Sequence, residues 1–264
     1  MKNILVHYNS AEELNSVIDA ALTLNKAYKT DITFAHVAEK AGQKDIDLQN
    51  QIQSLIKDRV SPGSNIKFVN KEGKPYQEIP EIAKDHHIII MKSEEEKGFH
   101  LFKSNSVYNA VVDSPCPVLT FKENGLKKIQ SIVIPIDTSA ESRQKIPKAI
   151  DIAKHFNATI HILAYGPENI GKEEKRKLEL YADQADHFIK EKGVKSVVDI
   201  ALGKNVIDMV IKYAEKNAVD MIIITVEEDA SYFGSSAAEK LIINSPIPVL
   251  SIQPKDLKVS WAGL

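Results

Sequence analysis

Two short segments 131 positions apart decide the fold: Ser114–Phe121 is SPCPVLTF and Ser245–Ile252 is SPIPVLSI. Further pairs match in the same chain order on either side of them: Ile4–Glu12 with Ile132–Glu141, Gly73–Lys74 with Gly203–Lys204, and Ile88–Met91 with Met221–Ile224. Internal matches that keep their order indicate a duplicated domain, and this period is too long for a solenoid repeat. The polar, glycine-containing stretch 122–128 separates the two copies.

Each copy alternates short β-rich runs with helical patterns. In the first copy we expect strands near 3–8, 32–37, 66–69, 88–91 and 118–121, and helices near 10–22, 45–58, 77–86 and 104–113. In the second copy we expect helices near 140–156, 172–192, 205–217 and 235–244. The fourth strand is continuously apolar in both copies, which is typical of a central parallel strand covered on both faces. The pattern predicts an α/β fold with two tandem, doubly wound, five-stranded parallel sheets flanked by helices.

This organisation predicts domains over 1–122 and 129–254 and a C-terminal tail over 255–264. Ligands of doubly wound sheets bind beyond the carboxyl ends of the strands, where the strand order switches. The loops after strands one, two and four are therefore where a function is expected.

The composition excludes several classes of protein. Hydrophobic residues make up 43% and charged residues 27% of the 264 residues, which argues against a disordered chain. The 34 basic and 36 acidic residues nearly balance, so no nucleic-acid or membrane partner is indicated. Cys116 is the single cysteine, and no stretch has the length of a signal peptide or a transmembrane helix. We expect a cytoplasmic protein.

The repeated segments together resemble the universal stress protein family in its tandem-domain form. The resemblance covers residues 3–122 and 129–253 and rests on the order of the motifs rather than on any single one. It implies a Rossmann-like fold of the adenine-nucleotide alpha hydrolase type in each copy. It also implies that the fifth strands, Val118–Phe121 and Val249–Ile252, pair antiparallel within one chain as a pseudo-dimer, with further association into a homodimer left open.

Nucleotide-binding members of this family carry an Asp after strand one and a loop Gly-x2-Gly-x9-Gly-Ser/Thr after strand four. Asn9 stands at the Asp position in the first copy, and Asp137 keeps it in the second. Counted back from the Pro-x-Pro, Ser104 and Ser235 replace the last glycine, and Asn105 and Ser236 follow them. The first two glycines are missing in both loops, while Gly98 and Gly234 lie out of register.

Both loops also carry three consecutive acids, Glu94–Glu96 and Glu227–Asp229. A carboxylate about 5 Å from a phosphate charge costs roughly 3 kcal/mol at an effective dielectric constant near 20. Two such contacts would remove most of the roughly 8 kcal/mol of a micromolar affinity. These acids are interpreted as solvated loop charges, as groups that exclude nucleotide, or as ligands of a divalent ion that bridges to phosphate.

The candidate ligand-binding residues are those at the ends of strands one and four: Asp137, Thr138, Gly234, Ser235, Ser236, Asn9, Ser104 and Asn105. The alternative role of Asp137, Ser235 and Ser236 is to cap the helices that follow them. No nucleophile–base motif appears, so no catalytic residue is assigned, and His86–His87 lack partners at metal-binding spacing.

The leading hypothesis is a non-catalytic stress-response or regulatory protein that has no cofactor and acts through a protein partner or a small ligand. The alternative is an ATP-binding sensor that uses only the second copy, and a weak nucleotide hydrolase is a third hypothesis.

Overall fold

The computed structural model describes residues 1–38, 43–93, 106–123, 125–226 and 235–254. The first half contains the following elements: β1 (Asn3–His7), α1 (Leu14–Tyr28), β2 (Asp31–Ala38), α2 (Gln43–Ile56), β3 (Ile66–Glu72), α3 (Pro75–Ile82), β4 (Ile88–Lys92), α4 (Ser106–Val112) and β5 (Val118–Phe121). The second half repeats the order: β6 (Ser131–Ile136), α5 (Ile146–Phe156), β7 (Thr159–Gly166), α6 (Lys172–Glu191), β8 (Ser196–Leu202), α7 (Val206–Lys216), β9 (Met221–Thr225), α8 (Ser235–Asn244) and β10 (Val249–Ile252). The α/β alternation predicted from the sequence is confirmed.

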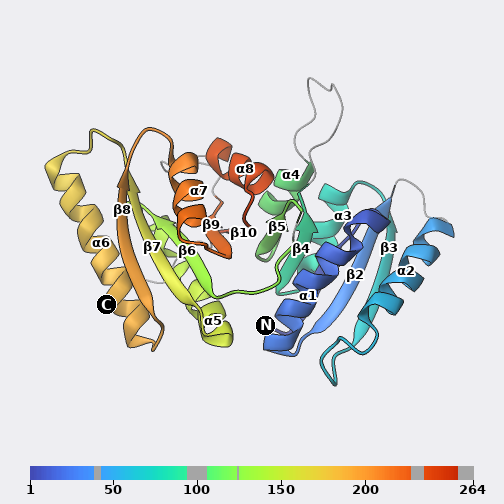
Figure 1. The fold of residues 1–264 in the computed structure, drawn as a ribbon. Coiled ribbons are helices and arrows are strands. Elements are labelled where there is room, and N and C mark those ends of the chain that lie inside the picture. The colour runs from blue at the N-terminus through green and yellow to red at the C-terminus, as the bar shows by residue number, and fades with distance from the viewer. Residues whose placement is uncertain (39–42, 94–105, 124, 227–234, 255–264) are drawn as a thin grey trace.

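The ten strands form one sheet in the order β3-β2-β1-β4-β5-β10-β9-β6-β7-β8 (Figure 1). Pairing is parallel within each half, and the two halves meet where β5 and β10 pair antiparallel. The sequence pattern predicts two five-stranded sheets, and the antiparallel pair that the resemblance implied joins them edge to edge. Each half thereby covers the edge strand that the other would expose.

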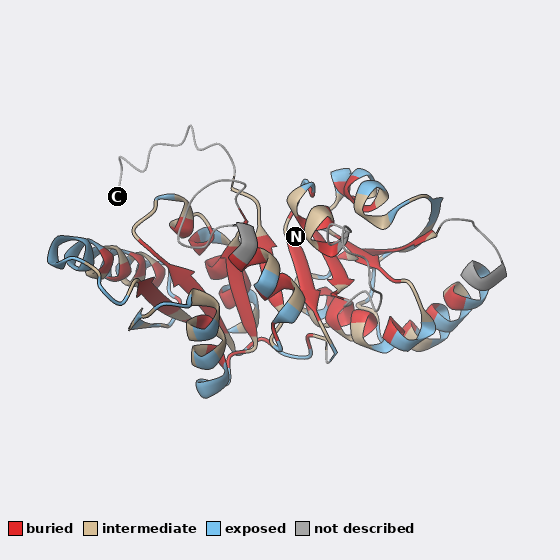
Figure 2. Ribbon diagram, turned by 90° about the horizontal axis from the view of Figure 1, so that it is seen from above, coloured by how far each residue is buried: buried red, intermediate tan, exposed pale blue. Residues whose placement is uncertain are grey.

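Two layers of helices cover the sheet, and each layer spans both halves. α1, α2, α5 and α6 contribute to one apolar core, while α3, α4, α7 and α8 contribute to the other. The first four residues of both β4 and β9 are buried, as their continuous apolar sequence predicts. Figure 2 shows the buried strands running between the helix layers, with the exposed residues on the outer sides of the helices.

The seam has an internal two-fold relation. Leu119 pairs with Leu250, its own counterpart in the sequence repeat, and the residues on either side pair reciprocally as Val118 with Ser251 and Thr120 with Val249. A pseudo-two-fold axis therefore passes through the Leu119–Leu250 pair. Among the described helices, none is long and apolar enough to cross a lipid bilayer.

Candidate functional site

The carboxyl end of β6 holds the aspartate that the sequence singles out. β6 lies between β7 and β9, so Asp137, which follows it, stands where the strand order switches. Its side chain is only 2% exposed. In the first half, Asn9 stands at the same place after β1, which lies between β2 and β4.

The carboxylate of Asp137 is held by hydrogen bonds from its own half of the molecule. One oxygen, Oδ1, accepts from the Ser139 backbone N–H at 2.9 Å and from the Ser139 hydroxyl. The other, Oδ2, accepts from the Tyr165 hydroxyl at 3.0 Å. The Asp137 N–H donates in turn to Ser142 Oγ at 3.2 Å. The loop after β6 is therefore organised around a buried anion.

These bonds determine the protonation state of the carboxylate. Burial acts to raise the pKa of Asp137, but the hydrogen bonds from Ser139, Tyr165 and Ser142 outweigh burial, and the pKa lies below its ordinary value of 3.8. Asp137 is therefore ionised at neutral pH. The bond from the Ser139 N–H closes a local turn, whereas Ala140 and Lys145 stand at the N-cap positions of the two helical segments that follow, so the alternative role of Asp137 as a helix cap is wrong.

The neighbouring candidate, Thr138, is also engaged within the chain. Its hydroxyl donates to Glu174 Oε1 at 2.8 Å, in the first turn of α6. Thr138 therefore ties the loop after β6 to α6.

A cavity of about 270 Å³ lies beyond the carboxyl ends of β7 and β8. Tyr165 lines it, is 3% exposed, and donates its hydroxyl to the Asp137 carboxylate. A Cβ added at Gly203 would lie 2.7 Å from Met209 Sδ, so Met209 packs directly against the Gly203 backbone. Lys204 and Glu168 both line the cavity, and Lys204 Nζ lies 3.6 Å from Glu168 Oε2. The opposite charges of the two side chains offset each other.

In the first half, a different carboxylate binds the backbone of the corresponding loop. Glu13 is 1% exposed, and its Oε1 accepts from the backbone N–H groups of Asn9 and, at 3.2 Å, of Ser10. This is the capping box that the spacing of Ser10 and Glu13 predicts. Tyr8 is fully buried and stacks on His36, with 5.3 Å between ring centroids. Both halves thus place a buried carboxylate at the end of their first strand.

Several predicted residues lie outside the part of the chain that the structure describes. These are Gly234, Ser104, Asn105, Gly98 and the two acidic runs Glu94–Glu96 and Glu227–Asp229. Ser235 and Ser236 begin α8, but only their backbone belongs to the described part. The structure brings Asp137 and Thr138 together in one loop and places Asn9 in the corresponding loop of the other half.

Tyr165 is the functional residue that sequence reasoning missed. It is the single tyrosine of an otherwise apolar strand end, ILAYG, and such a buried phenol usually needs a hydrogen-bond partner. That signal points to a polar neighbour but does not identify Asp137.

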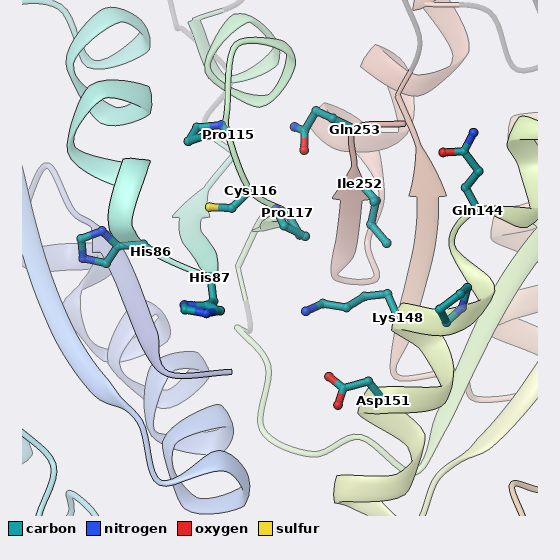
Figure 3. Close-up of a pocket in the computed structure, with 11 residues that line it drawn as sticks. His86, His87, Pro115, Cys116, Pro117, Gln144, Lys148, Asp151, Ile252 and Gln253 are labelled. Carbon is teal, nitrogen blue, oxygen red and sulfur yellow. The ribbon is translucent and has the colours of Figure 1, made fainter. Parts of the chain in front are cut away.

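A larger cavity, of about 670 Å³, lies at the seam between the halves, away from the predicted loops. Its lining comes from the amino ends of β4 and β5, from α5 and from the end of β10 (Figure 3). Burial raises the pKa of the Cys116 thiol there to about 11, so Cys116 is the buried small residue that the sequence predicts. His86 and His87 also line this cavity, and no group of three metal-ligating side chains exists among the described residues.

The strand order and the helix layers define a duplicated, doubly wound α/β protein. Residues 128–253 match the Universal stress protein family. The second half of the chain belongs to the universal stress protein family, and the chain as a whole has the tandem fold of the solved structures that follow.

Solved structures of similar length share this tandem fold. A universal stress protein from Archaeoglobus fulgidus DSM 4304 is 16% identical, with a TM-score of 0.74 over 96% of this chain and 97% of that one. A protein from Pseudomonas aeruginosa UCBPP-PA14, described as a universal stress protein, is 18% identical, with a TM-score of 0.72 over 97% of this chain and 94% of that one. A functionally unknown protein from Pseudomonas aeruginosa PAO1 is also 18% identical, with a TM-score of 0.71 and the same coverage. No curated protein matches the sequence.

Proposed function

We propose that this chain is a non-catalytic regulatory protein of the stress response that binds ATP weakly or not at all and acts through a protein partner or a small ligand. The proposal rests on the hydrogen bonds that Tyr165 and Ser139 donate to the Asp137 carboxylate, because these bonds occupy its oxygens. These contacts concern Asp137, which the ATP-sensor alternative would use together with Ser235 and Ser236.

A nucleotide would have to compete with the chain's own donors. A ribose hydroxyl that donates to Asp137 needs access to a side chain that is 2% exposed and covered by Tyr165. Displacing a hydrogen bond to a charged acceptor costs about 1.5–3 kcal/mol, before the ring is moved out of its packing. That cost weakens any affinity by about tenfold or more.

The corresponding loop of the first half, after β1, is also stabilised by a side chain of the same chain. Backbone N–H groups at the start of a helix can bind an anion. Asn9 and Ser10 already donate theirs to Glu13. In the second half, Lys204 lines the small cavity and forms an exposed pair with Glu168, which contributes little to stability. The bonds to the buried Glu13 favour a protein whose strand-end loops are stabilised from within.

Titration with ATP and Mg²⁺ tests the proposal, with thermal unfolding and calorimetry as readouts. A ligand at 100 times its Kd stabilises the folded state by about 2.7 kcal/mol, which raises the Tm of a chain this size by roughly 5 °C or more. We expect no heat of binding and no rise in Tm at 1 mM ATP, the concentration at which a Kd of about 10 µM gives that rise. Mass spectrometry of the intact protein as purified checks for a small ligand that stays bound.

Two outcomes contradict the proposal and identify its rivals. A rise in Tm that Asp137→Ala removes, measured as the difference with and without ATP for each variant, indicates the ATP sensor. Phosphate release that the same variant abolishes indicates the hydrolase. Asp199→Ala is the matched control for the first outcome, because Asp199 also accepts a hydrogen bond from a tyrosine hydroxyl but is not among the candidate ligand-binding residues.

A further inference from the structure

The pseudo-two-fold axis relates two grooves beside the seam, and the linker fills one of them. The linker is defined as residues 125–130, the described residues that lead into β6. Thr23 Oγ1 donates to the Leu126 carbonyl at 2.8 Å, and a Cβ built on Gly125 would lie 3.3 Å from Ser16 Cα. Leu126 and Ile129 are each 2% exposed. The linker therefore lies along α1 as an extended segment with two apolar anchors.

The linker also contacts the second half where β9 begins. Asp220 Oδ2 accepts from the Gln130 N–H at 2.7 Å, and Asp220 Oδ1 lies 3.4 Å from Lys128 Nζ. The linker groove is therefore bounded by α1 on one side and by the amino end of β9 on the other.

The counterpart of this groove is the large seam cavity. α1 and α5 both end in a residue with left-handed backbone, Lys29 with φ 51° and Asn157 with φ 53°. Counting back from these ends, Ser16 corresponds to Gln144 and Thr23 to Asp151, and both Gln144 and Asp151 line the cavity.

The strand side of the cavity corresponds in the same way. His87 N–H donates to the Asn3 carbonyl at 3.0 Å, as Asp220 N–H does to the Ser131 carbonyl at 3.0 Å. His87 is therefore the counterpart of Asp220, and it also lines the cavity. Figure 3 shows Lys148 and Asp151 of α5 on one side of the cavity and His87 on the other.

In the second groove, the position that corresponds to Ile129 is already taken by an apolar residue. Asn3 corresponds to Ser131, so Met1 corresponds to Ile129. Met1 is partly buried and packs against the same apolar core as Ile129. The place that corresponds to Gly125–Lys128 is the open cavity of about 670 Å³.

We propose that the C-terminal tail of the same chain binds in this cavity, with Leu257 in the place that Leu126 takes in the linker groove. The described chain leads there, since Ile252 and Gln253 line the cavity. With the shift of 131 that relates β5 to β10, Leu126–Lys127 corresponds to Leu257–Lys258, and the sequences agree at both positions.

The charges of the tail and the cavity are complementary. Lys148 and Asp151 line the cavity, and Asp256 and Lys258 flank Leu257 in the sequence. Three prolines, Cys116 and Ile252 give the rest of the wall an apolar part that suits a leucine anchor, beside the polar residues His86, His87, Gln144 and Gln253.

A disulfide cross-link tests the register. The Gly125–Ser16 spacing places the counterpart pair, Asp256 and Gln144, within the reach of a disulfide bond. We would combine Gln144→Cys and Asp256→Cys with Cys116→Ser, so that the introduced thiols are the only two in the full chain. The rate of cross-linking under a mild oxidant is followed by mass spectrometry, and circular dichroism verifies that each variant is folded.

The deciding comparison adds Leu257→Asp to this chain, with Leu264→Asp as the matched control farther along the tail. Both variants keep the thiols and the tether, and only the first removes the anchor. We expect Leu257→Asp to slow the cross-linking by about tenfold or more, the effect of losing one buried leucine. We expect Leu264→Asp to leave the rate unchanged. Equal rates for all three chains would overturn the proposal, and so would cross-linked dimers, which indicate the tail of a second copy.

Discussion

The hydrogen bond between Tyr165 and Asp137 leads to a measurable difference between two tyrosines. Tyr165→Phe removes one oxygen atom, the donor to Asp137 Oδ2 at 3.0 Å. Tyr213→Phe removes the same atom from a bond of nearly equal length, 3.1 Å, to Asp199 Oδ2, which lies at the exposed surface. The two substitutions remove the same atom and differ in the burial of the carboxylate, and the Tyr213 hydroxyl also lies 3.1 Å from His161 Nδ1.

The expected magnitudes follow from that burial. Leaving a buried carboxylate with one hydrogen bond fewer costs about 1.5–3 kcal/mol of unfolding free energy. The exposed pair contributes about 0–1 kcal/mol, because water replaces the lost donor. Urea unfolding at pH 7 should therefore place Tyr165→Phe clearly below the wild type and Tyr213→Phe close to it.

The pH dependence gives a second readout with a defined sign. The pKa of Asp137 in the folded protein lies below its ordinary value of 3.8, so the ionised form is the one that folding stabilises. This contribution is present above the ordinary pKa and is lost as the pH falls through the folded pKa. The difference between wild type and Tyr165→Phe should therefore be full at pH 7 and shrink below about pH 4. A Tyr165→Phe protein as stable as Tyr213→Phe at pH 7 would show that Tyr165 does not hold the carboxylate.

Two further predictions concern a buried histidine and two glycines. Burial, with a smaller effect of His36, lowers the pKa of His7 to about 4 from 6.5, so protonation favours the unfolded chain between these values. Between pH 7 and pH 4, the wild type should therefore lose about 3 kcal/mol more unfolding free energy than His7→Leu, as measured by urea unfolding. Gly125→Ala should cost at least about 1 kcal/mol more than Gly63→Ala in the same assay, because both have positive φ but only a Cβ at 125 meets backbone, the Ser16 carbonyl at 2.6 Å. Equal losses for the two glycine variants would mean that the linker is free to move away from α1.

The sequence predicted the fold because its signals are local or repeated. The apolar runs of β4 and β9, the capping box at Ser10 and the duplicated Pro-x-Pro segments each specify an element without knowledge of its neighbours. The antiparallel pairing of β5 and β10 was predicted from the family resemblance, because the sequence of an edge strand does not indicate which strand it pairs with.

The site was predicted less completely because its contacts join distant parts of the chain. Asp137 was identified by position, but its partner Tyr165 is 28 residues away on another strand. The seam cavity was not predicted, since it exists only where the amino ends of β4 and β5 meet α5 of the other half. Contacts of this kind depend on packing, which the order of elements in the sequence does not determine.

The pairing of Leu119 with Leu250 has a consequence for how the seam can change over generations. In an assembly of two identical chains, every substitution at the axis appears on both sides at once and must be compatible with itself. Here the two partners are encoded at separate positions of one gene. A mutation can therefore alter Thr120 without altering Ser251, and each half can diverge while the other preserves the junction.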